Sequence, residues 1–373
     1  MPSRMDDELT VTRALTVVSD LPRDAGPDAH AAAAGLVYVD EDDLAIVRVR
    51  CGRGFTYRYP DGSTVASGSA DRDRIERLVI PPAWTDVRIC LDDDGHIQAT
   101  GVDDAGRKQY RYHERWRGIR DATKFHRMSD FARVLPRVRD TVDRHLRKRG
   151  HARERMLALV VALLDETLIR IGNDRYARTN GAYGLTTLLC EHVEVDGARV
   201  RFSFPGKSGQ AQELELHHRR LAGQLLRCEE IPGQRMFGYQ QDDVWREIQS
   251  GDVNDYLREI AGEDVTAKDF RTWGATVVAA ETLRGLPRPD RPRDVETNVL
   301  AAIDAAAERL GNTRAVARSS YVDPRVPKAY RFGRFEEAWD RSSTVRRRLS
   351  PAERAVTRLL DLDLPPSTEL ASG

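Results

Sequence analysis

The sequence has few cysteines and no long hydrophobic run. Its longest apolar run, MLALVVALL at residues 156–164, has nine residues, far fewer than the about 20 that a membrane-spanning helix requires. The first residues are acidic and lack a secretory signal pattern. We therefore expect a cytoplasmic protein without a membrane partner. The four cysteines are too far apart for a zinc motif and are expected to be free thiols: Cys51, Cys90, Cys190 and Cys228.

Lysine is also scarce, since only six of the 59 basic residues are lysines. The chain uses arginine for ordinary surface charge, so a lysine is a candidate for a role that arginine cannot fill. Lys207, in FPGKSG at 204–209, resembles the end of a phosphate-binding loop for nucleotides. However, Arg201 occupies the position of that motif's first glycine, and the flanking segments alternate like strands. An ATP-binding loop is therefore excluded, and an exposed turn lysine remains the alternative to a catalytic one.

The length and the hydrophobic patterns predict an α+β fold in two domains. A chain of 373 residues exceeds what one core usually fills. Alternating segments between 36 and 117, with a short helix near 71–80, predict an N-terminal antiparallel β-sheet domain. Residues 118–365 have helical spacing and predict a mostly α-helical domain. Residues 1–35 are rich in Asp, Ala, Pro and Gly and are expected to be poorly ordered, and 366–373 form a tail.

A small antiparallel sheet is predicted within the helical domain, at residues 191–216. Asp196-Gly197 is a strong hairpin signal, and Lys207 lies at the tip of the second turn. After this sheet, four segments that end near glycine are predicted to be helices. They are DDVWREIQSG (242–251), VNDYLREIAG (253–262), AKDFRTWGATVVAAETLRG (267–285) and VETNVLAAIDAAAERLG (295–311).

Charge is distributed unevenly, although the net charge is zero. Residues 1–45 contain ten acidic and three basic residues, whereas residues 107–155 contain seventeen basic and six acidic ones. Tyr, Trp and His alternate with the basic residues of the second tract, which is typical of a nucleic-acid-binding surface. A solvated, salt-bridged helix face is the alternative interpretation of this tract.

Several motifs together resemble the type IB DNA topoisomerases, in particular their poxvirus-like and bacterial branch. The resemblance extends from about residue 81 to Tyr321. It is carried by GRKQYRY (106–112), IRIGNDRY (169–176), GAYGLTTL (181–188), FPGKSG, KDFRTWG (268–274) and GNTRAVARSSY (311–321). The fold implied is that shared by type IB topoisomerases and tyrosine recombinases.

The resemblance implies five catalytic residues. Arg170 follows a core helix, Lys207 lies 37 residues later on a hairpin, and Arg271 stands in an R-T-W-G context. Tyr321 is the implied nucleophile, and Asn312, nine residues before it, occupies a hydrogen-bonding position where the family usually has histidine. Taken singly, Arg170 would be a helix C-terminal cation and Asn312 a helix cap, so these alternatives remain open.

The implied chemistry needs these residue types. The phenol of Tyr321 attacks a backbone phosphodiester and forms a 3′-phosphotyrosine, which conserves the bond energy for resealing. The guanidiniums of Arg170 and Arg271 suit the charged phosphate oxygens. Lys207 would protonate the departing 5′-oxygen, because an ammonium gives up a proton more readily than a guanidinium. No cofactor or metal is implied.

The implied partner is double-stranded DNA, bound by a monomer. Two lobes joined near residues 118–125 would close around the duplex as a clamp. The candidate DNA contacts are Gln109, Tyr110, Tyr112, Tyr176 and Lys268.

Two other functions compete with this one. A tyrosine recombinase shares the chemistry, but the His-x-x-Arg pair usual in recombinases is missing near Arg271. A non-catalytic duplex-binding protein of the same fold would bind DNA and leave supercoils unchanged. The acidic segments at 92–94 and 361–363 are interpreted as solvated turns or tail, and His217-His218 as a strand end, so no metal site is expected.

Overall fold

The computed structural model describes residues 25–228, 235–242, 244–289, 291–339 and 348–362, together with Leu21 and Leu364. The chain forms two compact units, one with the residues up to His126 and one from Arg127 to Leu364. The tail expected at 366–373 lies outside the described residues, and so do residues 1–20 and 22–24 of the segment 1–35 that is expected to be poorly ordered.

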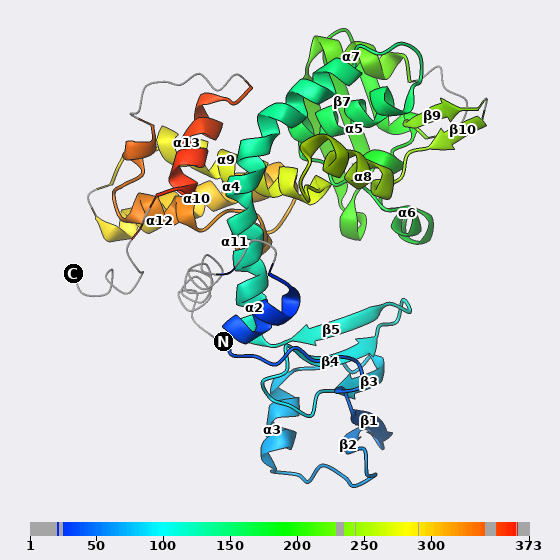
Figure 1. Ribbon diagram of the computed structural model, residues 1–373, viewed down its shortest axis with the longest axis vertical. Helices are drawn as coiled ribbons and strands as arrows, with labels where there is room; N and C mark the ends of the chain where they lie inside the picture. The colour runs from blue at the N-terminus through cyan, green and yellow to red at the C-terminus, as the bar shows by residue number, and fades with distance from the viewer. Residues whose placement is uncertain are drawn as a thin grey trace. The chain divides into compact units, whose positions relative to one another are not determined.

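The first unit is built on one antiparallel sheet with the strand order β2-β1-β3-β4-β5 (Figure 1). Its strands are β1 (Ile46–Cys51), β2 (Gly54–Arg58), β3 (Thr85–Ile89), β4 (Ile97–Val102) and β5 (Lys108–Tyr112). The short helix α3 (Ala70–Arg77) buries Ile75 against inward-facing residues of the sheet such as Ile89. This arrangement confirms the predicted N-terminal antiparallel domain.

A short helix, α2 (Pro27–Ala33), lies within the segment that the sequence predicts to be irregular. Ala31 of α2 packs with Trp116, Ile119 and Ala122, which belong to the first turns of α4 (Glu114–His145). A helix of seven residues is too short to be stable alone, so its sequence carries little signal and tertiary packing decides its structure. Residues 118–125, the expected joint between lobes, are part of α4.

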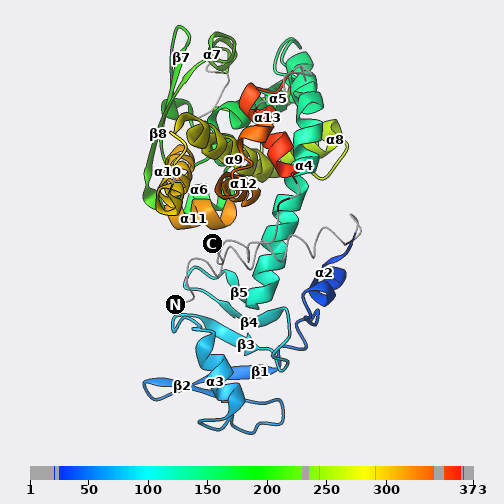
Figure 2. The ribbon, with the colours of Figure 1, turned by 90° about the vertical axis from the view of Figure 1, so that its left-hand side faces the viewer.

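The second unit is mostly helical. Its further helices are α5 (Arg153–Thr167), α6 (Asp174–Asn180), α7 (Arg219–Leu226), α8 (Ser250–Ala261), α9 (Ala267–Gly285), α10 (Pro292–Leu310), α11 (Arg314–Ser320), α12 (Arg325–Arg331) and α13 (Pro351–Leu360). Figure 2 shows α9 surrounded by α10, α12 and α13. The apolar helix α5 is buried along nearly its whole length, as its sequence predicts.

The predicted inserted sheet is present, with the strand order β6-β7-β8. Its strands are β6 (Val193–Asp196), β7 (Arg199–Pro205) and β8 (Ala211–His217). Residues of β7 alternate strictly between buried and exposed, so one face packs on the helices and the other meets solvent. Lys207 begins the short turn Lys207–Gly209 between β7 and β8, as predicted.

The prediction of a helix at 242–251 is wrong. Val244–Glu247 form strand β10, which pairs with β9 (Gly238–Gln241), and α8 begins only at Ser250. The hairpin is favoured because Trp245 packs across Gly238, where a Cβ atom would lie 2.3 Å from the indole ring. The apolar spacing of this short segment suits either structure, and the cross-strand contact decides between them.

Neither a membrane span nor a metal cluster occurs in the described part of the chain. No helix there is both long and apolar enough to cross a membrane. In the same residues, no three His, Cys, Asp or Glu side chains are grouped so that they could hold a metal ion.

Candidate active site

Arg170 follows α5 but does not cap it. The helix ends at Thr167, and Leu168 adopts a left-handed conformation with φ 57°. The last carbonyl oxygens of α5 are instead bound by two other arginines. Arg309 donates to Thr167 O at 2.9 Å and to Glu166 O at 2.6 Å, and Arg271 donates to Leu168 O. The helix-capping role considered for Arg170 is therefore filled elsewhere, and its side chain is available to the site.

The backbone of Arg170 is held by the GAYGLTTL segment. Its carbonyl oxygen accepts a hydrogen bond from Leu185 N at 2.8 Å. A Cβ atom on Gly184 would lie 2.4 Å from that same oxygen, so the close approach of the two segments requires glycine. This packing explains why the glycine-containing motif accompanies Arg170 in the sequence.

Arg271 is a buried guanidinium in the second turn of α9. Its residue exposure is 4%, and it donates to Leu310 O at 3.1 Å as well as to Leu168 O. Its Nε atom is buried without a hydrogen-bond partner. Burial, followed by the charge of Arg170, lowers the pKa of Arg271 to about 10, although Tyr321 acts in the opposite direction. Such a group gains stability when an anion enters the site.

Tyr321 lies beside Arg271, at the C-terminal end of α11. The guanidinium carbon of Arg271 is 5.3 Å from the centre of the phenol ring. Burial alone would raise the pKa of Tyr321, but the positive charge of Arg271 and a hydrogen bond with it, together with the charges of Arg170 and Lys268, lower it. The surroundings therefore favour the phenolate, which is the nucleophilic form.

Asn312 contacts Arg170 and does not cap α11. The cap is Thr313, whose side chain accepts a hydrogen bond from Val316 N at 3.4 Å. The Oδ1 atom of Asn312 accepts a hydrogen bond from Nη2 of Arg170. Its Nδ2 atom is buried without a partner. The Asn312 amide thus has, next to an arginine, a buried donor for which the described residues provide no acceptor.

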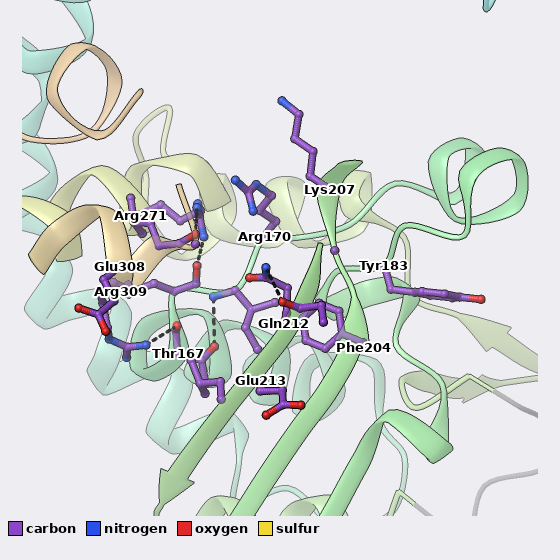
Figure 3. A pocket seen from close by; sticks show the side chains of 17 residues that line it. Thr167, Arg170, Tyr183, Phe204, Lys207, Gln212, Glu213, Arg271, Glu308 and Arg309 are labelled. Carbon is purple, nitrogen blue, oxygen red and sulfur yellow. Dashed lines mark hydrogen bonds between the residues drawn. The ribbon is translucent and has the colours of Figure 1, made fainter. Parts of the chain in front are cut away.

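Lys207 shares a cavity of about 330 Å³ with Arg170 and Arg271. Figure 3 shows Arg170 beside Arg271, with Lys207 extending from the hairpin at the edge of the cavity. Asn312 and Tyr321 are not part of the cavity lining, but they contact Arg170 and Arg271 respectively. Arg170, Lys207 and Arg271 therefore line one cavity, and Asn312 and Tyr321 each contact one of the two arginines. In Figure 3 the side chain of Lys207 points away from the two arginines.

The site carries excess positive charge. In the described residues, Arg170, Lys207 and Arg271 form no ion pair with a carboxylate, whereas arginines elsewhere in the chain are commonly paired, as Arg139 is with Asp165. Unneutralised cations around a cavity are suited to a phosphate group, which can accept several charge-assisted hydrogen bonds.

None of the five candidate DNA contacts is among the residues that line this cavity. Lys268 is exposed on α9, one turn before Arg271, and its charge reaches Tyr321. Tyr176 is 44% exposed on α6. On β5 of the first unit, the rings of Tyr110 and Tyr112 are stacked with their centres 5.7 Å apart.

Gln109 differs from its neighbours on β5. Side chains alternate along a strand, so Gln109 points to the opposite face from Tyr110 and Tyr112. Its Nε2 atom donates to Asp103 Oδ2 at 2.8 Å. A contact of Gln109 with DNA stays a prediction. To donate to DNA, the Nε2 atom of Gln109 would have to use its second hydrogen or give up the hydrogen bond to Asp103.

Two residues near the site were not found from the sequence. Arg309 lines the cavity and holds the end of α5. Gln212 also lines it, and its side chain lies against both Gly206 and Gly311, where added Cβ atoms would come within 2.5 and 2.6 Å. Arg309 carried one usable signal, a basic residue in the last turn of a predicted helix. Gln212 carried none, because its role depends on contacts between distant segments.

Comparison with known proteins relates both units to DNA topoisomerases. Residues 113–331 match the family described as eukaryotic DNA topoisomerase I, catalytic core, and residues 54–103 match bacterial DNA topoisomerase IB, N-terminal domain. The chain is 32% identical over 294 residues to DNA topoisomerase 1B of Acanthamoeba polyphaga mimivirus, which covers 76% of this chain and 87% of the relative.

More distant relatives carry the same type of name. DNA topoisomerase 1B of Vaccinia virus (strain Copenhagen) is 22% identical over 230 residues, or 60% of this chain and 68% of the relative. DNA topoisomerase 1 of Mus musculus is 25% identical over 256 residues, or 57% of this chain and 32% of the relative. All five residues of the candidate site fall within the matched range 113–331.

Proposed function

Because the chain belongs to the type IB DNA topoisomerase family, we propose that Tyr321 is the nucleophile with which it cuts and reseals one strand of duplex DNA. The observation that carries the proposal is the contact between Tyr321 and the buried, carboxylate-free guanidinium of Arg271. A guanidinium in this position can stabilise the negative charge that forms on a phosphate as the neighbouring phenol attacks it, so the contact supports phosphoryl transfer.

In the proposed cleavage step, the phenol of Tyr321 releases its proton to solvent, its oxygen forms a bond to phosphorus, and the bond between phosphorus and the 5′-oxygen breaks. The product is a 3′-phosphotyrosine and a free 5′-hydroxyl. Arg170 and Arg271 stabilise the charge on the non-bridging oxygens, and Asn312 donates a further hydrogen bond. Lys207 transfers a proton to the 5′-oxygen. Religation is the reverse reaction, and between the two steps the cut strand rotates about the intact one.

Because the phosphotyrosine conserves the energy of the cleaved bond, the cycle needs no nucleotide, and positive and negative supercoils both relax. The proposed substrate is double-stranded DNA, the proposed state is a monomer, and the location is the nucleoid in the cytoplasm. Phosphate contacts would dominate binding, so affinity should fall steeply with salt.

The proposal is tested with supercoiled plasmid of either sign in excess chelator and without nucleotide. Wild-type protein is expected to relax both plasmids, and denaturation during the reaction should trap DNA covalently linked to Tyr321. Tyr321→Phe lacks only the attacking oxygen, so it should bind duplex DNA with unchanged affinity and relax none. Relaxation by Tyr321→Phe, or linkage through another residue, would refute the assignment.

The same assay separates the rival functions. A tyrosine recombinase would exchange strands between two duplexes and assemble as a tetramer on DNA, which a sizing column detects. The position three residues before Arg271, where a recombinase usually has histidine, holds Lys268. A non-catalytic DNA-binding protein would form no covalent complex.

A further inference from the structure

A buried threonine on α9 contacts the backbone immediately around Tyr321. Thr276 is 1% exposed, and its Oγ1 atom accepts a hydrogen bond from Asp323 N at 3.0 Å. The hydroxyl hydrogen has two acceptors within reach, Thr272 O at 2.8 Å and Tyr321 O at 3.2 Å. One hydroxyl therefore contacts the main chain on both sides of Val322.

The helix that precedes Tyr321 holds it only weakly. α11 has seven residues, and Ala317 is its buried one. The amides of Tyr321 and Val322 both bond to Ala317 O, at 3.0 and 2.9 Å. The buried side chain of Val322 anchors the segment by apolar packing, which has little directional preference. Besides the contact of the phenol with Arg271, hydrogen bonds to the chain that follows Tyr321 therefore help to fix the direction in which the phenol points.

That following chain is fixed at a second point. Asp323 is fully buried, and its carboxylate accepts hydrogen bonds from Arg325 Nε at 3.0 Å and from Nη2 at 2.8 Å. Arg325 Nη1 donates in turn to Leu360 O at 3.0 Å, at the end of α13. Arg325, which is bound to the end of α13, therefore fixes the carboxylate of Asp323. Thr276 of α9 fixes the backbone amide of the same residue.

We propose that Thr276 is a positioning residue that sets the direction of the Tyr321 phenol for attack, an inference that rests on Tyr321 being the nucleophile. Arg271 and Thr276 belong to the same helix, so α9 fixes both the guanidinium that meets the phosphate and the backbone that carries the phenol. The spacing between these two groups is then as rigid as the helix itself. In-line attack depends strongly on such alignment, and a small displacement of the nucleophile slows the reaction substantially.

The test compares three variants in single-turnover DNA cleavage. Thr276→Val has nearly the same shape but no hydroxyl, and it should cleave about 10- to 100-fold more slowly. Its affinity for DNA should stay within about twofold, since Thr276 does not touch the substrate. Thr276→Ser restores the hydroxyl and should restore most of the rate. Thr282→Val is the matched control, because Thr282 on the same helix donates only to Val278 O, at 2.8 Å.

A merely structural role predicts a different result. In that case Thr276→Ser, which leaves a small cavity, would be impaired together with Thr276→Val, and the positioning role would be rejected. Cleavage by Thr276→Val at the wild-type rate would also reject it. A wild-type protein that cleaves no DNA would instead contradict the proposed function, so the two failures are distinguishable.

Hydrogen exchange provides a readout that needs no variant to fold. The Asp323 amide is expected to exchange slowly in the wild-type protein, because its hydrogen bond to Thr276 is buried. Where the variants fold, the Asp323 amide should lose its protection against hydrogen exchange in Thr276→Val and keep it in Thr276→Ser. Exchange of the wild-type Asp323 amide at the rate of an exposed amide would overturn the proposal.

Discussion

The guanidinium of Arg271 lies over the ring of Tyr321, with 5.3 Å between the guanidinium carbon and the ring centre. Burial of the phenol alone would raise its pKa, and the neighbouring cations reverse the direction of the shift. The same arginine therefore has two effects. It makes the phenolate easier to form, and it stabilises the negative charge that appears when the phenolate attacks a phosphate.

Replacing Arg271 with glutamine should separate these effects through the pH dependence of cleavage. The pKa of Tyr321 should rise, so the rate should level off at a higher pH than in the wild-type protein. At neutral pH the cleavage rate should fall by about 10³-fold. Lys268→Gln removes a smaller contribution to the same shift and should displace the profile less. Single-turnover cleavage across the pH range measures both, and an unshifted Arg271→Gln profile would contradict the proposed coupling.

Lys207→Ala should be rescued by a better leaving group. If Lys207 protonates the 5′-oxygen, its loss should slow cleavage of ordinary DNA by about 10²- to 10⁴-fold. A substrate with sulfur at the 5′ position leaves as a thiolate and needs no proton, so the variant should cleave it at nearly the wild-type rate. Arg271→Gln is the control, since stabilisation of the phosphate oxygens is needed with either leaving atom. Equal defects of Lys207→Ala on both substrates would exclude the general-acid role.

The sequence indicated which residues are candidates for the site more readily than it indicated their surroundings. Arg170, Lys207 and Arg271 stand in short motifs whose residue types follow from the chemistry, and the structure brings them to one cavity. Asn312 was ambiguous between a cap and a phosphate contact. Thr313 is the cap, and the bond of Asn312 to Arg170, which is distant in the sequence, places Asn312 next to the candidate site. Local pattern alone could not have shown that bond.

The structural features that the sequence pattern did not predict have a common physical cause. The segment 242–251 has apolar spacing that suits a helix, but the contact of Trp245 with Gly238 and the pairing with β9 make it a strand. Helix α2 forms because α4 provides an apolar surface for Ala31. Thr276 looks like an ordinary helix residue until the chain after Tyr321 folds against it. In each case a contact outside the local pattern, with a neighbouring strand or with a distant segment, decides what the pattern leaves open.

Glu353 should stabilise the second unit, and its contribution should depend on pH. Its carboxylate accepts hydrogen bonds from Arg139 Nη2 at 2.7 Å and Trp273 Nε1 at 3.1 Å, which ties α13 to α4 and α9. Burial would raise the pKa of Glu353, but the bonds and charge of Arg139 lower it below the ordinary value of 4.5. The stabilisation is therefore complete above that value and is lost as the pH falls through the lower pKa of the folded state.

Glu353→Gln should accordingly reduce the free energy of unfolding by about 1.5–3 kcal/mol at neutral pH. The difference from wild type should shrink in acid, because the wild-type carboxylate then becomes neutral as well. Urea unfolding of the wild-type protein and of Glu353→Gln measures this difference in free energy at neutral and at acidic pH. Glu296→Gln is the control, since Glu296 pairs with Arg331 at the surface and should contribute less than about 1 kcal/mol. A gap between Glu353→Gln and wild type that stays constant in acid would contradict this account.

Substitutions of Asn312 should show whether its free amide hydrogens matter for cleavage. Oδ1 already accepts a bond from Arg170, so only Nδ2 is available to a phosphate oxygen. Asn312→Ala should slow cleavage by about 10²-fold. Asn312→Asp keeps the acceptor for Arg170, loses the donor and adds a negative charge, so it should be slower still.

Asn312→His restores a donor but introduces a group that titrates. Protonation of Tyr321 slows cleavage by every variant as the pH falls. Below about 6.5, where the imidazole gains a proton and a positive charge, the rate of Asn312→His should therefore rise relative to the wild-type rate, because the wild-type amide does not titrate in this range. Single-turnover cleavage by the three variants at several pH values shows whether the amide donor of Asn312 contributes to the cleavage rate. If Asn312→Asp cleaves as fast as wild type, the amide acts only by holding Arg170, since an acceptor at residue 312 is then sufficient for catalysis.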